Sequence, residues 1–333
     1  MHPPTPTAAV PPRSWIAAAL CALCLWAPRA LRAQGDEDPR PAPAAGQAEA
    51  DKPIPFERIL ELIGEDAFLT IRSKAADGLP LTADFYPGRS KDAPILLLFH
   101  QAGASRGEYR RTAPLFQKRG YTCLALDARA GDGIGWGVAN VTRAHATERK
   151  QPVGYEDARQ DLERCLPWVR EIGLTGPIVL VGSSYSASLV LLMATPESDG
   201  KRVAGVVAFS PGEYLKPKGK VLEAVKRVEV PVFMTCSRNE VLDTAGPMAR
   251  NLKHAKSQFF LPKVGEHGSR FLWLVDAKDA DSAEDARELW KRLWAFLGEV
   301  APVPAPASRP AGTEAGEAAG SRPATREAGG GED

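Results

Sequence analysis

The chain has 333 residues, of which 44% are hydrophobic and 25% are charged, as in ordinary globular proteins. Its 42 basic and 41 acidic residues leave a net charge of +1, which argues against partners held by strong electrostatic attraction, such as nucleic acid or an anionic membrane surface. We therefore expect a protein with a sizeable core whose partner is a small molecule.

The first 33 residues are typical of an export signal. Arg13 precedes an apolar run of 13 residues from Trp15 to Ala27, which is shorter than the ~20 residues that span a bilayer. Small residues follow at Ala30 and Ala33, so we expect cleavage of this signal peptide after Ala33. The mature protein is then periplasmic or secreted and has no stable membrane insertion. An uncleaved anchor is the alternative.

The cysteines indicate neither a disulfide framework nor a metal site. Cys21 and Cys24 form a C-x-x-C inside the predicted signal and would leave with it. The mature chain keeps Cys123, Cys165 and Cys236, an odd number with no closely spaced pair. We expect these three thiols to be free and buried.

Two segments lack the apolar periodicity that a folded element needs. Residues 34–53 are rich in proline, alanine and charge, and residues 301–333 have the same character with added glycine. We expect the first to be a disordered linker and the second a disordered tail. Residues 54–300 remain as one catalytic domain.

The pattern within this domain predicts an α/β fold. "AFLTIRS" and "PLTADFYPG" alternate with period two on either side of "AADG", which favours an antiparallel hairpin. Short continuous apolar runs follow, as expected of strands buried on both faces of a parallel sheet. These runs are residues 95–99, 123–126, 178–181, 206–209 and 232–234. We predict a mostly parallel central sheet with an N-terminal antiparallel hairpin and helices on both faces.

Amphipathic segments separate these runs and predict the helices. They span residues 105–120, 155–173 and 282–300, the last with Leu289, Leu293 and Leu297 on one face.

The stretch "IVLVGSSYSASLVLLMA", residues 178–194, carries the main chemical signal. It is an apolar strand, a small-residue turn and an apolar helix, which resembles a G-x-S-x-G nucleophile turn with Ser184 as the nucleophile. The residues two before and two after Ser184 must be small, and Gly182 and Ser186 meet that demand. Ser183 and Ser186 are expected to be structural. The alternative is a serine-rich turn that only caps the helix.

A serine hydroxyl needs a base, because it is a poor nucleophile at its own pKa. His267 lies late in the chain, in the Gly-flanked loop "GEHG" beyond an apolar segment. Three other histidines follow the signal. We expect His145 to lie in a charged loop, His254 on a polar helix-like surface, and His100 to shape the loop around it.

The third member holds the imidazole in the productive tautomer and stabilises its charged form. The loop after "VPVFMTCS" offers Glu240 and Asp243. We favour Glu240, which is nearer the strand end, with Asp243 as the alternative acid. The carboxylate without this role would cap the following helix.

Acyl transfer also needs N–H donors for the oxygen on which charge develops. One donor would be the backbone of Tyr185, at the positive end of the following helix. The other would come from "FHQAGASRGEY", as Gln101 or Ala102, with Gly103 allowing close backbone approach.

The order of "LLLFHQAG", "LALDARAGDG", "VGSSYSAS", "VPVFMTCSRNE" and "GEHG" resembles the α/β-hydrolase superfamily, and is similar to its dienelactone-hydrolase-like and serine esterase members. The resemblance covers about residues 68–299. It implies that Ser184, Glu240 and His267 are nucleophile, acid and base, and that the loop after His100 forms the oxyanion hole.

This sequence departs from the family pattern at three points. Ser186 replaces a glycine, Gln101 stands where a glycine often follows the histidine, and a serine replaces the cysteine of dienelactone hydrolases proper. The last departure makes dienelactone a poor substrate candidate.

The sequence thus predicts a serine hydrolase that cleaves carboxylic esters of small substrates through an acyl-enzyme on Ser184, with no metal or cofactor. The loop from Ala130 to Tyr155, with Trp136, would wall the site and favour short acyl chains. A solvated connector is the alternative for this loop. Acyltransferase, peptidase and thioesterase activities on the same triad are alternatives, as is a non-catalytic hydrolase-fold binding protein.

Overall fold

The computed structural model describes residues 55–63, 67–131, 134–135 and 137–304. The predicted signal peptide, the predicted linker and most of the predicted tail lie outside the described residues. No helix among those described is both long and apolar enough to cross a membrane. Cys123, Cys165 and Cys236 are free and buried, as expected.

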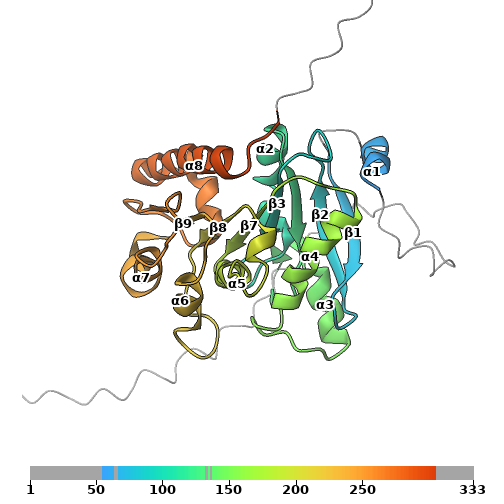
Figure 1. The fold of residues 1–333 in the computed structure, drawn as a ribbon, viewed down its shortest axis with the longest axis horizontal. Coiled ribbons are helices and arrows are strands. Elements are labelled where there is room, and N and C mark those ends of the chain that lie inside the picture. Colours follow the sequence, from blue (N-terminus) through green and yellow to red (C-terminus); the bar gives the residue numbers. More distant parts are fainter. Residues whose placement is uncertain (1–54, 64–66, 132–133, 136, 305–333) are drawn as a thin grey trace, which may run out of the picture. The chain divides into compact units, whose positions relative to one another are not determined.

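An eight-stranded sheet forms the centre of the domain (Figure 1). Its strands lie in the order β1-β2-β4-β3-β7-β8-β9-β10. They are β1 (Leu69–Lys74), β2 (Pro80–Tyr86), β3 (Ile95–Phe99), β4 (Thr122–Leu126), β7 (Ile178–Ser183), β8 (Gly205–Phe209), β9 (Val232–Thr235) and β10 (Gln258–Phe260). β2 pairs antiparallel with β1 and β4, and the other pairs are parallel. The predicted α/β class with its N-terminal hairpin is confirmed.

A second, small sheet consists of β5 (Ile134–Gly135) and β6 (Val138–Ala139), which pair antiparallel. It lies in the loop that follows β4. Asn140 then begins the next helix, because its side chain accepts a hydrogen bond from the Arg143 N–H.

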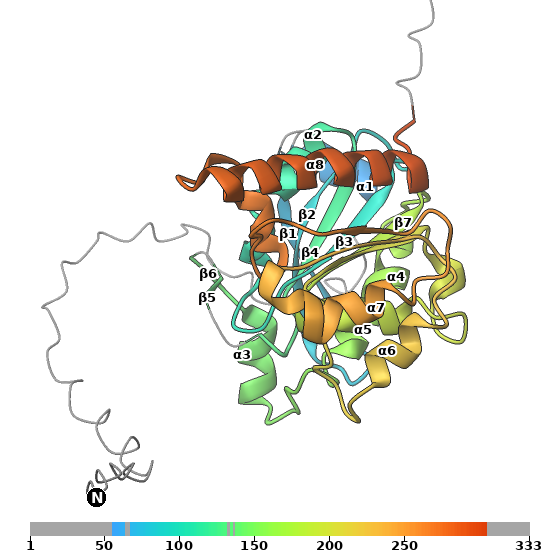
Figure 2. The same ribbon diagram turned by 90° about the vertical axis from the view of Figure 1, so that its left-hand side faces the viewer.

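Helices cover both faces of the main sheet, as Figure 2 shows. The helices are α1 (Phe56–Ile63), α2 (Ala113–Lys118), α3 (Val141–Glu148), α4 (Arg159–Glu171), α5 (Tyr185–Met193), α6 (Lys220–Val225), α7 (Gly246–Ala249) and α8 (Ala280–Val300). α2 and α8 pack on one face, and α4, α5 and α6 pack on the other. Because these helices bury both faces of the parallel strands, the strands are continuous apolar runs in the sequence.

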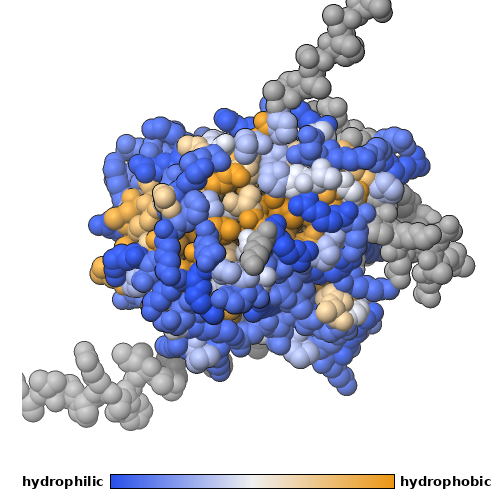
Figure 3. All heavy atoms as spheres, viewed as in Figure 1, coloured by the Kyte–Doolittle hydropathy of each residue, from blue (hydrophilic) through white to orange (hydrophobic). Residues whose placement is uncertain are grey.

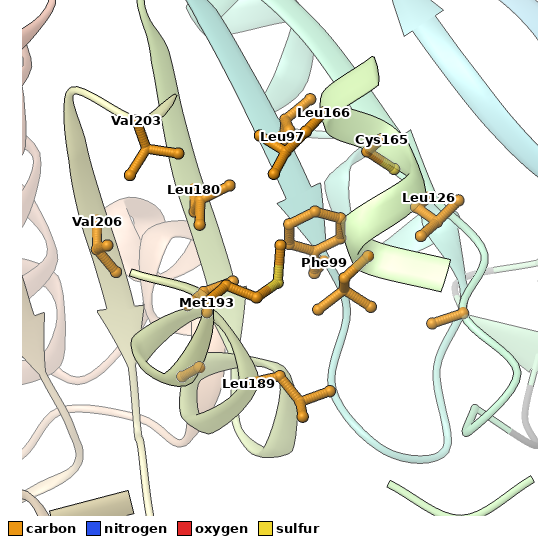
Figure 4. Close-up of a cluster of buried hydrophobic side chains, with 14 of the residues drawn as sticks. Leu97, Phe99, Leu126, Cys165, Leu166, Leu180, Leu189, Met193, Val203 and Val206 are labelled. Carbon is orange, nitrogen blue, oxygen red and sulfur yellow. The ribbon is translucent and has the colours of Figure 1, made fainter. Parts of the chain in front are cut away.

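The central strand β3 shows how the sheet divides the core. Ile95, Leu97 and Phe99 face the α4 and α5 side, whereas Leu96 and Leu98 face the α2 and α8 side. Figure 4 shows the first of these layers, where Leu97, Phe99 and Leu180 of the strands meet Cys165, Leu166, Leu189 and Met193 of the helices. Hydrophobic residues also gather across the middle of the molecular face drawn in Figure 3.

The helix predicted over residues 105–120 is broken in the structure. A 3₁₀ helix spans Arg106–Tyr109, and α2 starts only at Ala113. The break lies at Pro114, in the first turn of α2, because proline has no N–H to donate and its ring would clash with the preceding turn of a continuous helix. The buried Arg106 of the 3₁₀ helix donates to Asp84 at 2.9 Å and to Asp127 at 2.5 Å.

Two histidines lie in elements other than those expected. His145 is in α3 and not in a loop. His254 follows the end of α7, and its Nδ1 accepts the Lys256 N–H at 3.1 Å in a turn, so the expected helix is absent there.

The first residues beyond α8 still belong to the folded domain. Ala301 is buried, and Val303 packs against Gly120, where an added Cβ would lie 2.7 Å from the valine side chain. The packed domain therefore continues a few residues past the predicted boundary at residue 300.

Candidate active site

Ser184 occupies a sharp turn between β7 and α5. Its φ of 60° and ψ of −122° are unusual for a residue with a Cβ, which costs about 1–3 kcal/mol and persists only where the surroundings enforce it. A Cβ on Gly182 would lie 2.5 Å from the Ser186 carbonyl oxygen and 2.6 Å from the Ala187 nitrogen. The turn thus requires glycine at position 182 and lifts one serine out of the regular strand and helix.

The neighbouring Ser183 and Ser186 form hydrogen bonds that link this turn to other loops. The Ser186 hydroxyl donates to the His100 carbonyl oxygen at 2.6 Å, which ties α5 to the loop after β3. The Ser183 hydroxyl accepts the Ser269 N–H at 2.9 Å, which ties β7 to the loop after His267. Serine in place of the last glycine of the motif therefore adds a contact that glycine could not make.

The structure brings His267 and Glu240 into contact. His267 Nδ1 hydrogen bonds to Glu240 Oε1. Glu240 Oε2 accepts the Ser210 hydroxyl at 2.7 Å and the Ser237 N–H at 3.0 Å. Both carboxylate oxygens are thus held, and one of them is directed at the imidazole.

Asp243 lies elsewhere. It is exposed, in the π-helical turn Val241–Ala245 that follows Glu240. α7 has Ala245 at its N-cap position and no side-chain cap, so the helix-capping role expected for the second carboxylate is wrong.

The contact between Glu240 and His267 shifts the pKa values of both groups. Burial raises the pKa of Glu240, but the hydrogen bonds from His267 and Ser210 outweigh it and lower that pKa to about 2. The hydrogen bond to Glu240 raises the pKa of His267 above 6.5, against the opposing effect of burial. The charges of Glu240, Glu108 and Glu266 add to this rise. The pair therefore combines an ionised carboxylate with a strengthened base.

His100 shapes the loop that follows β3. It is fully buried, its Nδ1 lies 2.8 Å from the Gln101 carbonyl oxygen, and its Nε2 accepts the Ala128 N–H at 3.0 Å. These partners fix the neutral tautomer with the proton on Nδ1. With both ring nitrogens bonded within the protein, His100 serves the structure of the loop, as its sequence position suggested.

The two expected donors of this loop differ in what they bind. The Gln101 N–H donates to the Glu108 carboxylate at 2.8 Å, which argues against Gln101 as an oxyanion donor. Among the described residues, no acceptor is bonded to the N–H of Ala102 or to the N–H of Tyr185 at the start of α5. The geometry favours Ala102 and Tyr185 as the donor pair.

Sequence reasoning missed Ser210. This buried serine follows β8 with a φ of 53°, donates to Glu240 and accepts the Gly268 N–H at 2.9 Å. Its place at the carboxyl end of a parallel strand was a usable signal, because all reactive groups of such sheets gather at that edge.

Three tyrosines form an aromatic group beside Ser184. Tyr155 stacks on Tyr185 with ring centroids 4.6 Å apart, and Tyr214 meets Tyr155 edge-on at 6.5 Å. Burial raises the pKa of Tyr214, while a hydrogen bond with Ser184 opposes the rise. Tyr155 and Tyr214 are each 37% exposed, so they flank Ser184 while remaining open to solvent. Trp136, which the sequence suggests as part of the wall of the site, lies outside the described residues.

The groups meet because their strands are neighbours in the sheet. The loop of Ala102 follows β3, Ser184 follows β7, Glu240 follows β9 and His267 follows β10. This arrangement can take a proton from a serine hydroxyl and bind a developing oxyanion. Within the described part of the chain, no group of three or more His, Cys, Asp or Glu side chains is placed to hold a metal ion.

Solved structures of other proteins share this fold. An esterase from Pyrococcus furiosus has a TM-score of 0.53 at 18% identity, over 70% of this chain and 92% of that chain. A dienelactone hydrolase from Anabaena variabilis has 0.53 at 14% identity, over 71% and 99%. A carboxyl esterase from Bacillus coagulans has 0.51 at 12% identity, over 70% and 99%. At these identities the likeness shows the fold.

The family is shown by a sequence profile. A search of curated protein sequences finds no match. The profile of the alpha/beta hydrolase family matches residues 95–323, more than half of the chain. The resemblance inferred from the order of motifs is therefore confirmed, and the chain belongs to the alpha/beta hydrolase family.

Proposed function

We propose that this protein is a serine hydrolase that cleaves carboxylic esters of small substrates through an acyl-enzyme on Ser184. The observation that carries this proposal is the hydrogen bond between His267 Nδ1 and Glu240, on loops that adjoin the strained turn of Ser184. A hydroxyl, an acid and a base in this chain order can serve as the nucleophile, the orienting carboxylate and the general base of acyl transfer.

The first half of the reaction is attack on the ester carbonyl. Glu240 occupies Nδ1 of the imidazole, which leaves Nε2 of His267 to take the proton from Ser184 as its oxygen attacks. The imidazolium that forms is stabilised by the ionised Glu240, whose pKa is about 2. The base then gives the proton to the departing alcohol oxygen.

The oxyanion is bound by the backbone N–H groups of Ala102 and Tyr185. Each such donor contributes about 2.7–4 kcal/mol to lowering the barrier. Tyr185 adds the positive end of α5, since its N–H is the first of that helix. In the second half, water attacks the acyl-enzyme with His267 again as base, and Ser184 is released.

The structural neighbours support ester substrates, because they include an esterase and a carboxyl esterase. A serine nucleophile argues against dienelactone, since dienelactone hydrolases proper use cysteine. We propose that Tyr155 and Tyr214, whose rings are in contact, form a wall beside Ser184 and favour short acyl chains.

We also propose that the protein is exported and acts in the periplasm or outside the cell, on the basis of the predicted signal in residues 1–33. Sequencing the N-terminus of the protein recovered from the periplasm or medium tests this. A chain beginning at Gln34 supports export with cleavage after Ala33, and an intact Met1 in the cytoplasmic fraction refutes it.

Hydrolysis of a series of p-nitrophenyl esters tests the proposed activity. The wild type should cleave the acetate and butyrate esters faster than the octanoate, and Ser184→Ala should abolish this activity while the protein stays folded. Activity that survives in Ser184→Ala would refute the proposal. Adding a short alcohol separates hydrolysis from acyl transfer, because a transferase would yield the new ester.

A further inference from the structure

Glu108 is a fully buried carboxylate that the mechanism above does not use. It lies in the 3₁₀ helix Arg106–Tyr109, and its two oxygens bind two different loops of the site. Oε2 accepts the Gln101 N–H of the oxyanion loop at 2.8 Å. Oε1 accepts the hydroxyl of Ser269 at 2.5 Å, two residues beyond the base His267.

The loop after His267 is tightly fixed around this contact. The Ser269 N–H donates to Ser183, and the Gly268 N–H donates to Ser210, so two consecutive backbone donors are bonded. A Cβ on Gly268 would lie 2.5 Å from both Gln101 Oε1 and the Ser183 hydroxyl. The oxyanion loop, the nucleophile strand and the base loop therefore meet at this point, and Glu108 is bonded to the first and the last.

The nearest arginines along the chain do not neutralise Glu108. Arg106 pairs with Asp84 and Asp127, and Arg110 also pairs with Asp84. The two described bonds to Glu108 come instead from neutral donors, an amide and a hydroxyl. Burying a carboxylate without a cation is costly, and a neutral glutamine has the same shape. Both oxygens of Glu108 act as acceptors in these bonds, as the oxygens of a carboxylate do.

We propose that Glu108 is a positioning residue of this site: its two hydrogen bonds lock the oxyanion loop to the base loop and leave Ala102 as the free donor of the oxyanion loop. The same carboxylate places a negative charge beside the base loop. This inference rests on the proposed serine hydrolase function.

The electrostatics of His267 agree with this role. The hydrogen bond to Glu240 is the main cause of its raised pKa, burial opposes the rise, and the charges of Glu240, Glu108 and Glu266 add to it. These three carboxylates are the charged groups with the largest effects on the imidazole. Of them, Glu108 alone also binds the oxyanion loop.

Two substitutions separate the charge of Glu108 from its bridging contacts. Glu108→Gln removes the charge but keeps an acceptor for Gln101 and a donor for Ser269. The acidic limb of the kcat/KM profile should then move to lower pH than in the wild type. Ser269→Ala removes one contact and keeps the charge. The acidic limb of the Ser269→Ala profile should stay at the wild-type pH. Its kcat should fall about tenfold, because a small displacement of a catalytic group lowers the rate steeply.

Glu148→Gln is the matched control. Glu148 is an exposed glutamate on α3 whose described ion pair is with His145, so this variant removes one negative charge from the surface and keeps the described contacts of Glu108 and His267. Its pH profile and kcat should equal those of the wild type.

Titration of the histidines by NMR, with ¹³C-labelled histidine, provides a readout that needs no activity. The pKa of His267 should fall in Glu108→Gln and not in Glu148→Gln. If the wild type proves inactive on esters, the proposed function fails, while this titration still decides the role of Glu108. An unchanged His267 titration together with an unchanged kcat in Ser269→Ala would overturn the inference.

Should Glu108→Gln fail to fold, Glu108→Asp keeps the charge and shortens the bridge. The expected result is a wild-type acidic limb with kcat lowered at least about fivefold. A wild-type kcat in this variant would show that the bridge is unnecessary and would overturn the inference.

Discussion

The Ser210 hydroxyl donates a hydrogen bond of 2.7 Å to Glu240 Oε2. This bond joins the end of β8 to the turn after β9 and leaves Oε1 of the carboxylate for His267. Ser210 also accepts the Gly268 N–H, so one side chain holds both Glu240 and the residue next to His267. Its φ of 53° is unfavourable for serine, which means that the surroundings enforce this conformation.

Ser210→Ala should lower kcat/KM with little change in KM, because the carboxylate loses a hydrogen bond that fixes its orientation. A bond to a charged group contributes about 1.5–3 kcal/mol, which corresponds to roughly a tenfold to hundredfold loss. Steady-state kinetics on a short p-nitrophenyl ester measures this. The control is Ser257→Ala, which removes a hydroxyl bonded to the Val232 N–H at the other end of β9. Equal losses in both variants would contradict the account.

Glu240→Gln and Asp243→Asn distinguish the two candidate acids. Glu240 contacts the imidazole and Asp243 is exposed, so we expect a loss of about 10³–10⁴-fold in kcat for the first and less than about twofold for the second. Rapid kinetics with both purified variants checks this. A larger loss in Asp243→Asn would reassign the acid.

The pH dependence of activity follows from the raised pKa of His267. The base must be neutral to accept a proton, so kcat/KM should rise with pH and its acidic limb should lie above pH 6.5. In Glu240→Gln the remaining activity should show a limb at lower pH. A wild-type limb below pH 6 would contradict the assignment.

The same pair makes folding stability depend on pH. The lowered pKa of Glu240 gives stability that is present above its ordinary value of 4.5 and is lost as the pH falls towards 2. The raised pKa of His267 gives stability that is present below 6.5 and is lost as the pH rises through the folded-state value. The free energy of unfolding of the wild type should therefore exceed that of Glu240→Gln most between pH 4.5 and 6.5. Urea unfolding across pH measures this difference, and a difference independent of pH would refute it.

The three serines of the turn should respond differently to substitution. Ser183→Ala and Ser186→Ala each lose one hydrogen bond, of about 1 kcal/mol, and should keep part of the activity. Ser186→Gly recreates G-x-S-x-G but should be less stable still, since glycine weakens a helix by about 1 kcal/mol. Thermal unfolding and ester hydrolysis test these variants. A more active and more stable Ser186→Gly would show that the Ser186 hydroxyl has no structural role.

Tyr155→Ala should widen the site. We expect the ratio of kcat/KM for an octanoyl ester over an acetyl ester to rise at least about fivefold, because burying each added CH₂ gains ~0.8 kcal/mol once space exists. Phe68→Ala is the control, as Phe68 is also exposed and stacks on a buried tyrosine, Tyr86, at 5.0 Å. An unchanged ratio would remove Tyr155 from the pocket wall.

The sequence predicted those features that depend on local pattern and chain order. The parallel strands were visible as apolar runs, and the chain order of Ser184, Glu240 and His267 selected the residues that the structure places at one edge of the sheet. Glu108 and Ser210 escaped prediction because their roles depend on contacts with loops 161 and 30 residues away along the chain. The sequence suggests the Gln101 N–H as an oxyanion donor, but in the structure this N–H donates to Glu108.

Reaction with a fluorophosphonate probe, followed by mass spectrometric mapping, tests the central claim most directly. The account predicts a single adduct on Ser184 in the folded wild type, none in Ser184→Ala, and much slower labelling in His267→Ala. A folded wild type that stays unlabelled, or an adduct on Ser183 or Ser186 in its place, would contradict it.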